Sequence, residues 1–216
     1  MSERHVNYIL AVAAILVAYI FGSIPVGYLV ARLYGVDVTA SGSGRTGGTN
    51  VLRSVGPVAA ALTIMGDILK GLIPVYLLAI VAHPLVTALA ATATVVGHNH
   101  SLFLHFRGGV GAGTAMGALG GLTFPGALVV AAAGLIALGV SRYASVLSTT
   151  IAVATLVVLV VFAGLGYVPY AYILSGVLTL LVMFNALRPN FARLRAGTER
   201  KVGQKPENIV RVSTHH

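Results

Sequence analysis

Long hydrophobic stretches alternate with short polar, glycine-rich segments along the whole chain. Runs of this kind predict membrane helices, because an α-helix of about 20 apolar residues crosses the hydrocarbon core of a bilayer. The first run contains Gly22-Ser23-Ile24-Pro25, where the proline removes a backbone hydrogen bond and predicts a kink. The expected transmembrane helices, about seven in number, cover residues 7–34, 58–82, 85–97, 114–122, 125–140, 143–165 and 169–187.

Three consecutive members of this set are too short to cross a bilayer comfortably. They cover residues 85–97, 114–122 and 125–140, with Thr123-Phe124-Pro125 as the turn between the last two. We expect them to dip into the membrane, to tilt, or to meet as half-helices around a polar cavity. Such a cavity is where irregular backbone is tolerated at membrane depth.

Composition supports the membrane assignment. Of the 216 residues, 57% are hydrophobic and 9% are charged, and the mean hydropathy is +0.91, whereas about a quarter of the residues in a soluble domain are charged. The first hydrophobic run is too long for the core of a signal peptide and is expected to remain as a helix. The absence of cysteine excludes a thiol nucleophile, a disulfide framework and cysteine metal sites. The sequence therefore predicts an all-α integral membrane protein.

The basic residues predict its orientation. With seven crossings and the N-terminus outside, twelve of the fourteen Lys and Arg residues fall on one side, with Arg4 opposite and Lys70 inside a helix. The positive-inside rule makes that side cytoplasmic, and the net charge of +9 then reflects contact with anionic lipid headgroups. A nucleic-acid partner is not indicated, because no basic patch is interleaved with stacking aromatic residues and Trp is absent.

A glycine-rich octet from Arg107 to Thr114 lies in the polar segment at residues 98–113 and the start of the next helix. Dense glycines allow backbone N–H groups to converge on one point, and a neighbouring cation makes this a candidate oxyanion site. Its candidate binding residues are Arg107, Gly108, Gly109, Gly111 and Gly113. The alternative is close helix packing, which small residues also permit in membranes.

Two further polar segments fall on the same predicted side. The first, residues 41–53, contains Ser43, Arg45, Thr49, Asn50 and Arg53. Asn50 and Arg53 would share one face at a helix start and hold an anion from the side, although a solvated Ser/Gly loop is the alternative.

The second segment, residues 185–201, contains Arg188, Asn190 and Glu199. By itself it is also typical of a basic anchor for lipid headgroups. We expect residues 1–187 to form the membrane-embedded domain and residues 188–216 to form a basic cytoplasmic tail.

Two further features carry titratable groups. Asp67 and Lys70, three residues apart, are expected to pair inside the membrane, either at a site or as a lock between helices. His98 is a candidate base, and the alternative is a hydrogen-bonded structural histidine.

Taken together and in order, these segments resemble the PlsY family of bacterial acyl-phosphate:glycerol-3-phosphate acyltransferases. The similarity covers nearly the whole chain. It rests on the following positions: Gly22 to Tyr28, Gly42-Ser43-Gly44, Thr49-Asn50, Arg53, Asp67, Lys70-Gly71, Gly97-His98, Phe106 to Gly109, Ser141-Arg142-Tyr143, Arg188, Asn190, Arg193-Leu194, Gly197, Glu199 and Lys201.

The resemblance implies transfer of an acyl group from acyl phosphate to glycerol 3-phosphate at the cytoplasmic face of the bacterial plasma membrane, without cofactor or metal. It implies that Ser43, Arg53 and Asn190 serve catalysis. The other implied contacts to the two substrates come from Arg45, Thr49, Asn50, His98, Arg107, Gly108, Gly109, Gly111, Gly113, Ser145, Ser148, Arg188 and Glu199.

The chemistry of the residues agrees with the family's reaction. A basic glycine-rich cavity beside lipid suits two phosphate-bearing substrates, and an activated acyl phosphate needs no covalent enzyme intermediate. No histidine is followed five positions later by aspartate, so the dyad of acyltransferases that use acyl-CoA is absent.

The chain departs from the family's usual motifs at Arg45, Val110 and Leu187, where Asn, Lys and His usually stand. We hypothesise that Arg45 replaces the cation missing at Val110. Two alternatives remain open from the residues alone: a catalytically altered relative that binds lipid phosphate, and a small-solute transporter with broken helices.

Overall fold

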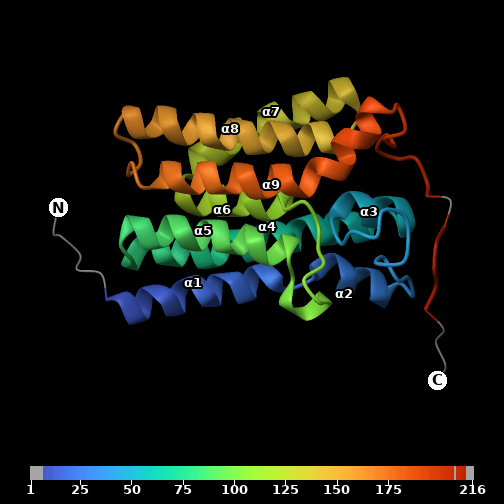
Figure 1. Ribbon diagram of the computed structural model, residues 1–216, viewed down its shortest axis with the longest axis horizontal. Helices are drawn as coiled ribbons and strands as arrows, with labels where there is room; N and C mark the ends of the chain where they lie inside the picture. Colours follow the sequence, from blue (N-terminus) through green and yellow to red (C-terminus); the bar gives the residue numbers. More distant parts are fainter. Residues whose placement is uncertain (1–6, 207, 213–216) are drawn as a thin grey trace.

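The computed structural model describes residues 7–206 and 208–212. Its helices are α1 (Tyr8–Ser23), α2 (Val26–Leu33), α3 (Gly48–Ser54), α4 (Pro57–Val81), α5 (Pro84–Asn99), the 3-10 helix η1 (Leu102–Leu104), α6 (Ala112–Leu122), α7 (Phe124–Ser141), α8 (Ala144–Gly164) and α9 (Tyr172–Arg195). Within this described part, β-structure is limited to two isolated bridges. The long helices lie side by side along one direction, while α2, α3 and the C-terminal segment gather at one end of the bundle (Figure 1).

Among the described residues, five segments are long and apolar enough to cross a membrane by length and composition: Tyr8–Leu33, Pro57–Val81, Phe124–Ser141, Ala144–Gly164 and Tyr172–Arg195. Large apolar side chains cover their outer faces, as Met65 on α4 and Ile136 on α7 illustrate with exposures of 55% and 67%. Apolar side chains on an outer face suit lipid as the surrounding solvent. The expectation that α7 is too short to cross is wrong, because its helix has 18 residues.

The short helix α6 forms the centre of the bundle. It has 11 residues, and its buried positions include Thr114, Gly117 and Gly121. A Cβ on Gly117 would overlap with the carbonyl oxygen of Ile68 on α4, so glycine lets the two backbones touch. Small residues at such crossings are how membrane helices gain van der Waals contact. A short helix inside the bundle agrees with the half-helix expectation for this segment.

The predicted kink in the first hydrophobic run is a break between α1 and α2 at Ile24 and Pro25. The carbonyl of Ile24 accepts a hydrogen bond of 2.8 Å from Lys70 Nζ on α4. The break therefore exposes a backbone acceptor that a buried cation satisfies.

Helix α9 extends beyond its predicted end at Leu187 and continues to Arg195, with Pro189 inside it. A proline within a helix removes one backbone hydrogen bond but does not stop the helix when packing supports it. The division of the chain at residue 187 stays a prediction, and α9 crosses that position. The continuation presents Asn190 and Arg193 from a rigid helix rather than from a flexible tail.

Candidate active site

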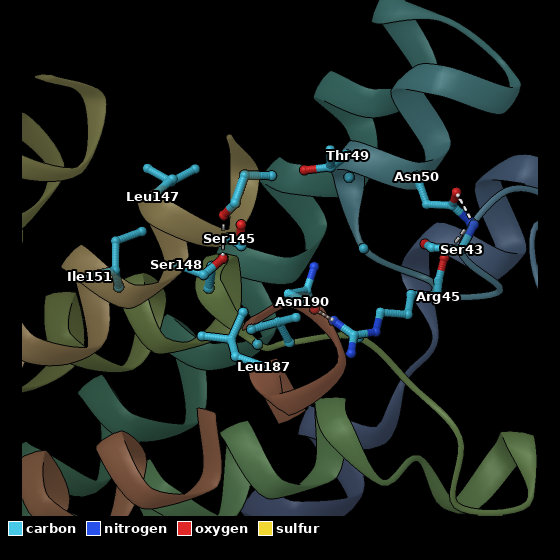
Figure 2. Close-up of a pocket in the computed structure, with 18 of the residues that line it drawn as sticks. Ser43, Arg45, Thr49, Asn50, Ser145, Leu147, Ser148, Ile151, Leu187 and Asn190 are labelled. Atoms are coloured by element: carbon cyan, nitrogen blue, oxygen red, sulfur yellow. Dashed lines mark hydrogen bonds between the residues drawn. The ribbon is translucent and has the colours of Figure 1, made fainter. Parts of the chain in front are cut away.

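A cavity of about 680 Å³ lies where the three polar segments meet (Figure 2). Its lining includes Ser43, Arg45, Thr49, Asn50 and Arg53 from residues 41–53, His98 and Gly109 to Gly113 from residues 98–113, and Asn190 and Glu199 from residues 185–201. The structure therefore brings the three segments to one recess, as the sequence predicted. Among the predicted site residues, those that line it are Ser43, Arg45, Thr49, Asn50, Arg53, His98, Gly109, Gly111, Gly113, Ser145, Ser148, Asn190 and Glu199.

Asn50 shapes the first segment from within. Asn50 is 3% exposed, and its side-chain Nδ2 donates to the carbonyl oxygens of Val38, Ser41 and Arg45 at 3.1, 3.0 and 2.9 Å. Its Oδ1 accepts the backbone N–H of Ser43 at 3.0 Å. Because these bonds occupy both ends of the amide, Asn50 holds the loop that carries Ser43 and Arg45 to the cavity.

A hydrogen-bonded network joins the first segment to α9. Arg45 Nη1 donates to Asn190 Oδ1 at 2.7 Å, as Figure 2 shows, and Nη2 donates to the carbonyl of Ala186 at 2.5 Å. Asn190 Nδ2 in turn donates to Glu199 Oε1 at 2.7 Å, and Glu199 Oε2 accepts from Arg193 Nε at 2.7 Å. The carboxylate of Glu199 thereby fixes the orientation of the Asn190 amide between two arginines.

The cationic character of the recess follows from a count of its charges. Its lining contains four arginines, Arg45, Arg53, Arg193 and Arg200, against two acids, Glu199 and Asp67. Asp67 is neutralised by its ion pair with Lys70. Burial lowers the pKa of Arg45, and Arg193 lowers it further while Glu199 raises it. Arginine side chains nonetheless stay protonated in proteins at neutral pH. A desolvated guanidinium is a strong partner for an oxyanion.

Arg53 fastens the C-terminal segment to α3. Its Nη2 donates to the carbonyl oxygens of Arg200 and Lys201 at 2.7 and 3.2 Å. Burial lowers the pKa of Arg53, and the nearby carboxylate of Glu199 opposes that shift. Its Nε is buried without a hydrogen-bond partner among the described residues.

The glycine segment leads directly into the N-terminus of α6. Gly111 has a φ of +91°, which favours glycine, and it caps the helix without a side-chain hydrogen bond. Gly113, within the first turn, lines the cavity. A helix N-terminus has free N–H groups and a partial positive charge, so it suits a phosphate oxygen.

The predicted pair of Asp67 and Lys70 is confirmed, with Lys70 Nζ 2.9 Å from Asp67 Oδ1. The sequence did not show that His98 joins them: its Nδ1 lies 3.4 Å from the same oxygen. Among the described residues, no group of three or more His, Cys, Asp or Glu side chains is placed to hold a metal ion.

Comparison with known proteins places this chain in a family. A family model described as glycerol-3-phosphate acyltransferase matches residues 12–197, which is most of the chain. The chain belongs to the glycerol-3-phosphate acyltransferase family. A glycerol-3-phosphate acyltransferase of Carboxydothermus hydrogenoformans is 37% identical over 195 residues, covering 90% of this chain and 97% of the relative. One from Rubrobacter xylanophilus is 42% identical over 204 residues, covering 90% and 96%.

Two solved structures of the integral membrane glycerol 3-phosphate acyltransferase PlsY have the same fold. The glycerol 3-phosphate form superposes with a TM-score of 0.82 and is 30% identical, covering 90% of this chain and 96% of that one. The lysophosphatidic acid form has a TM-score of 0.80 and is 29% identical, covering 89% and 95%. This glycerol-3-phosphate acyltransferase family member is therefore an all-α integral membrane protein. Family membership also favours an acyltransferase over the small-solute transporter that the sequence left open.

Three predicted residues of this family member do not line the cavity: Arg107, Gly108 and Arg188. Arg107 follows two residues with positive φ, His105 and Phe106, and its side chain is exposed. Arg188 is exposed because its neighbour Leu187 occupies the inward face of α9, and adjacent helical residues point about 100° apart. These arginines add to the basic surface of the acyltransferase rather than to its recess.

The apolar part of the lining was missed by the sequence analysis. It comes from α7 (Ala131, Leu135, Leu138), α8 (Leu147, Ile151), Met116 and Leu187. The three α7 positions share one helix face by spacing. Since α7 is apolar on every side, no hydrophobic pattern distinguishes that face from the one in contact with lipid. The polar lining residues Asp67, Arg193, Thr198 and Arg200 were also not assigned to the site.

Proposed function

We propose that the protein transfers a fatty acyl group from acyl phosphate to the sn-1 hydroxyl of glycerol 3-phosphate. The products are lysophosphatidate and inorganic phosphate. One observation carries the proposal: a single cavity joins an arginine-rich, glycine-rich end to an apolar wall formed by α7 and α8. Both substrates carry phosphate, and only the donor carries a long alkyl chain, so this combination suits the pair.

In the proposed reaction, the acceptor hydroxyl oxygen attacks the carbonyl carbon of the donor. The bond between that carbon and the bridging phosphate oxygen breaks, and its electron pair leaves with the phosphate. The proton of the attacking hydroxyl passes to an oxygen of the departing phosphate, so the protein need not supply a base. The protein's contribution is then to hold both substrates in line and to stabilise negative charge.

Three residues are assigned to catalysis in this proposal. Arg53 and Ser43 both line the recess and would contact a substrate phosphate. Asn190, fixed by Arg45 and Glu199, would align the acceptor hydroxyl. Its Oδ1 can accept a second hydrogen bond beside the one from Arg45.

The donor would lie between the glycine segment and α8. Ser145 Oγ is buried without a hydrogen-bond partner among the described residues and faces the cavity, whereas Ser148 Oγ donates to the carbonyl of Ala144. Ser145 therefore has a free hydroxyl for a donor oxygen. Beyond it, Leu147 and Ile151 begin the apolar wall that would receive the alkyl chain.

The predicted orientation places this cavity at the cytoplasmic face of a bacterial plasma membrane. The support is that α2, α3 and the C-terminal segment lie at one end of the bundle, the end where most basic residues fall (Figure 1). Glycerol 3-phosphate is water-soluble, so its pocket must open toward an aqueous compartment.

The test is incubation of the purified protein with acyl phosphate and glycerol 3-phosphate, followed by measurement of phosphate release and of lysophosphatidate. We expect one phosphate per lysophosphatidate formed. Acyl-CoA as the only donor should give no product. Product from acyl-CoA at a comparable rate, or phosphate release independent of glycerol 3-phosphate, would contradict the proposal.

A further inference from the structure

A buried group of three titratable side chains lies below the glycine segment and has no part in the reaction above. Asp67, Lys70 and His98 are 3%, 6% and 4% exposed. Lys70 Nζ lies 2.9 Å from Asp67 Oδ1 and 2.8 Å from the carbonyl oxygen of Ile24, to which it donates. A buried ion pair is often no more stabilising than apolar residues of the same volume, and charges inside a membrane mark functional sites by default. The burial of these charges therefore points to a role beyond stability.

His98 makes direct contact with the glycine segment. Its carbonyl oxygen accepts the N–H of Gly109 at 3.2 Å. A Cβ on Gly109 would overlap with Nε2 of the His98 ring, and a Cβ on Gly108 would overlap with the His98 carbonyl oxygen. The ring and the backbone of His98 thus pack directly against Gly108 and Gly109.

Asp67 reaches the other end of the same segment and also the ring. Its Cβ lies 3.1 Å from the position that a Cβ on Gly113 would occupy. Its Oδ1 lies 3.4 Å from His98 Nδ1. Because Nδ1 faces Asp67, Nε2 is turned toward Gly109, and a rotated ring would press on the loop. Asp67 therefore lies against both the His98 ring and the start of α6.

We propose that Asp67, Lys70 and His98 are positioning residues that hold residues 109–113 in the shape that binds a phosphate oxygen. Asp67, His98, Gly109 and Gly113 all line the cavity, so the loop and its support share the recess. Lys70 pairs with Asp67, so the group brings no net negative charge to an anion site. The proposal rests on the proposed function, because a phosphate is the group that both substrates share.

The first experiment is a double-mutant cycle on His98→Ala and Gly109→Ala. It is read by calorimetric binding of inorganic phosphate and, separately, of glycerol 3-phosphate to the detergent-solubilised protein. We expect Gly109→Ala to weaken phosphate binding about tenfold in the wild-type background, a coupling typical of residues in contact. With the ring removed by His98→Ala, the same substitution should weaken it less than about threefold.

The matched control is Gly139→Ala, because a Cβ on Gly139 of α7 meets nothing within 4 Å. It should leave phosphate affinity unchanged. Equal losses from Gly109→Ala in both backgrounds would overturn the proposal, since the ring would then not be what constrains the loop.

The second experiment removes both charges together, as Asp67→Asn with Lys70→Met, so that no unpaired charge is left inside the protein. We expect the KM for a phosphate-bearing substrate to rise about tenfold, kcat to change much less, and the unfolding midpoint to stay within about 3 °C. Titrating each substrate separately shows whether the donor's or the acceptor's phosphate uses the loop. A loss of affinity that only follows a lower unfolding midpoint would overturn the positioning role.

These measurements separate the two proposals. Phosphate binding with a non-additive cycle but no acyl transfer overturns the proposed function alone. Wild-type protein that binds neither inorganic phosphate nor glycerol 3-phosphate overturns the positioning proposal.

Discussion

Arg45 is the residue whose contacts most clearly link the loop of the first segment to the helical bundle. It crosses from the loop to α9 and donates to Asn190 and to the carbonyl of Ala186. Val110 and Leu187, the two other positions where the chain departs from the family's usual motifs, line the same cavity. Arg45, Val110 and Leu187 therefore all line one recess. This is consistent with the hypothesis that Arg45 supplies the cation absent at Val110.

The hypothesis predicts the outcome of exchanging these residues. Arg45→Asn should lower kcat/KM with acyl phosphate and glycerol 3-phosphate about a hundredfold, the effect of losing one charged donor from a desolvated anion site. Adding Val110→Lys to that variant should restore most of the loss. Steady-state kinetics on the wild type, both single variants and the double variant check this. Full turnover in Arg45→Asn alone would show that Arg45 is dispensable.

The role of Asn50 in the structure differs from the role that its residue type suggested. The sequence indicated an amide beside an arginine on one helix face, as for direct anion contact. The structure shows the amide bonded to four backbone groups of the preceding loop. The inward amide is the polar core of that loop, because buried backbone groups require partners. Nothing in the local pattern distinguishes an amide that binds a ligand from one that binds its own loop.

Among the helices, α7 and α8 form the apolar wall that determines which ligands fit the cavity. Ala131, Leu135 and Leu138 share the cavity-facing side of α7, while Ile136 on another side is 67% exposed. The helix thus has one apolar face for a ligand and another for lipid. A substitution on the first face should change the choice of substrate, and one on the second should not.

Enlarging a side chain on the cavity face of α7 should shorten the preferred acyl chain. Ala131→Phe is expected to raise the KM for a long-chain acyl phosphate about tenfold, the order of effect of overpacking a well-filled site. A short-chain acyl phosphate should be affected far less. The control is Ala132→Phe, at an exposed position that does not line the cavity. Equal effects on both chain lengths would show that the alkyl chain lies elsewhere.

Helix α9 continues past the end that its sequence pattern predicts. Its polar C-terminal part, with Pro189 inside, suggested a tail, but packing continues the helix to Arg195. One rigid element therefore carries both Asn190 and Arg193, and Glu199 returns from the following segment to bond both. Tertiary contacts override the local signals for a helix end, because most helix stability in proteins comes from packing.

For the whole molecule, the basic residues predict which end faces the cytoplasm, and labelling of single cysteines tests it. Because the chain has no cysteine, single cysteines report on exposure without interference. Tyr167, in the turn between α8 and α9, is 74% exposed and lies on the predicted outer side. His105, beside η1, is exposed and lies on the predicted cytoplasmic side.

The predicted orientation gives opposite labelling of the two positions. Tyr167→Cys should react with a membrane-impermeant maleimide in intact spheroplasts, whereas His105→Cys should react only after the membrane is permeabilised. Labelling of His105→Cys in intact cells, with Tyr167→Cys protected, would reverse the orientation. The predicted position of Arg4 on the outer side lies outside the residues that the structure describes.

Several properties of this protein are determined by its sequence alone. The long apolar runs predict a membrane protein, because exposing so much apolar surface to water is unfavourable. This conclusion needs only the sequence. The Pro25 break, the pairing of Asp67 with Lys70 and the three polar segments also follow from local pattern. Each of these depends on residues that are near in sequence or on the solvent around the helices.

Only the tertiary structure decides which residues of those segments share a recess. It excludes Arg107 and Arg188 from the lining, includes Arg193 and Arg200, and selects one face of α7. It also places His98 against Gly109 and Asp67. The physical reason is that these contacts join distant parts of the chain, and in a helix that is apolar on every side the direction of each face is set by its neighbours.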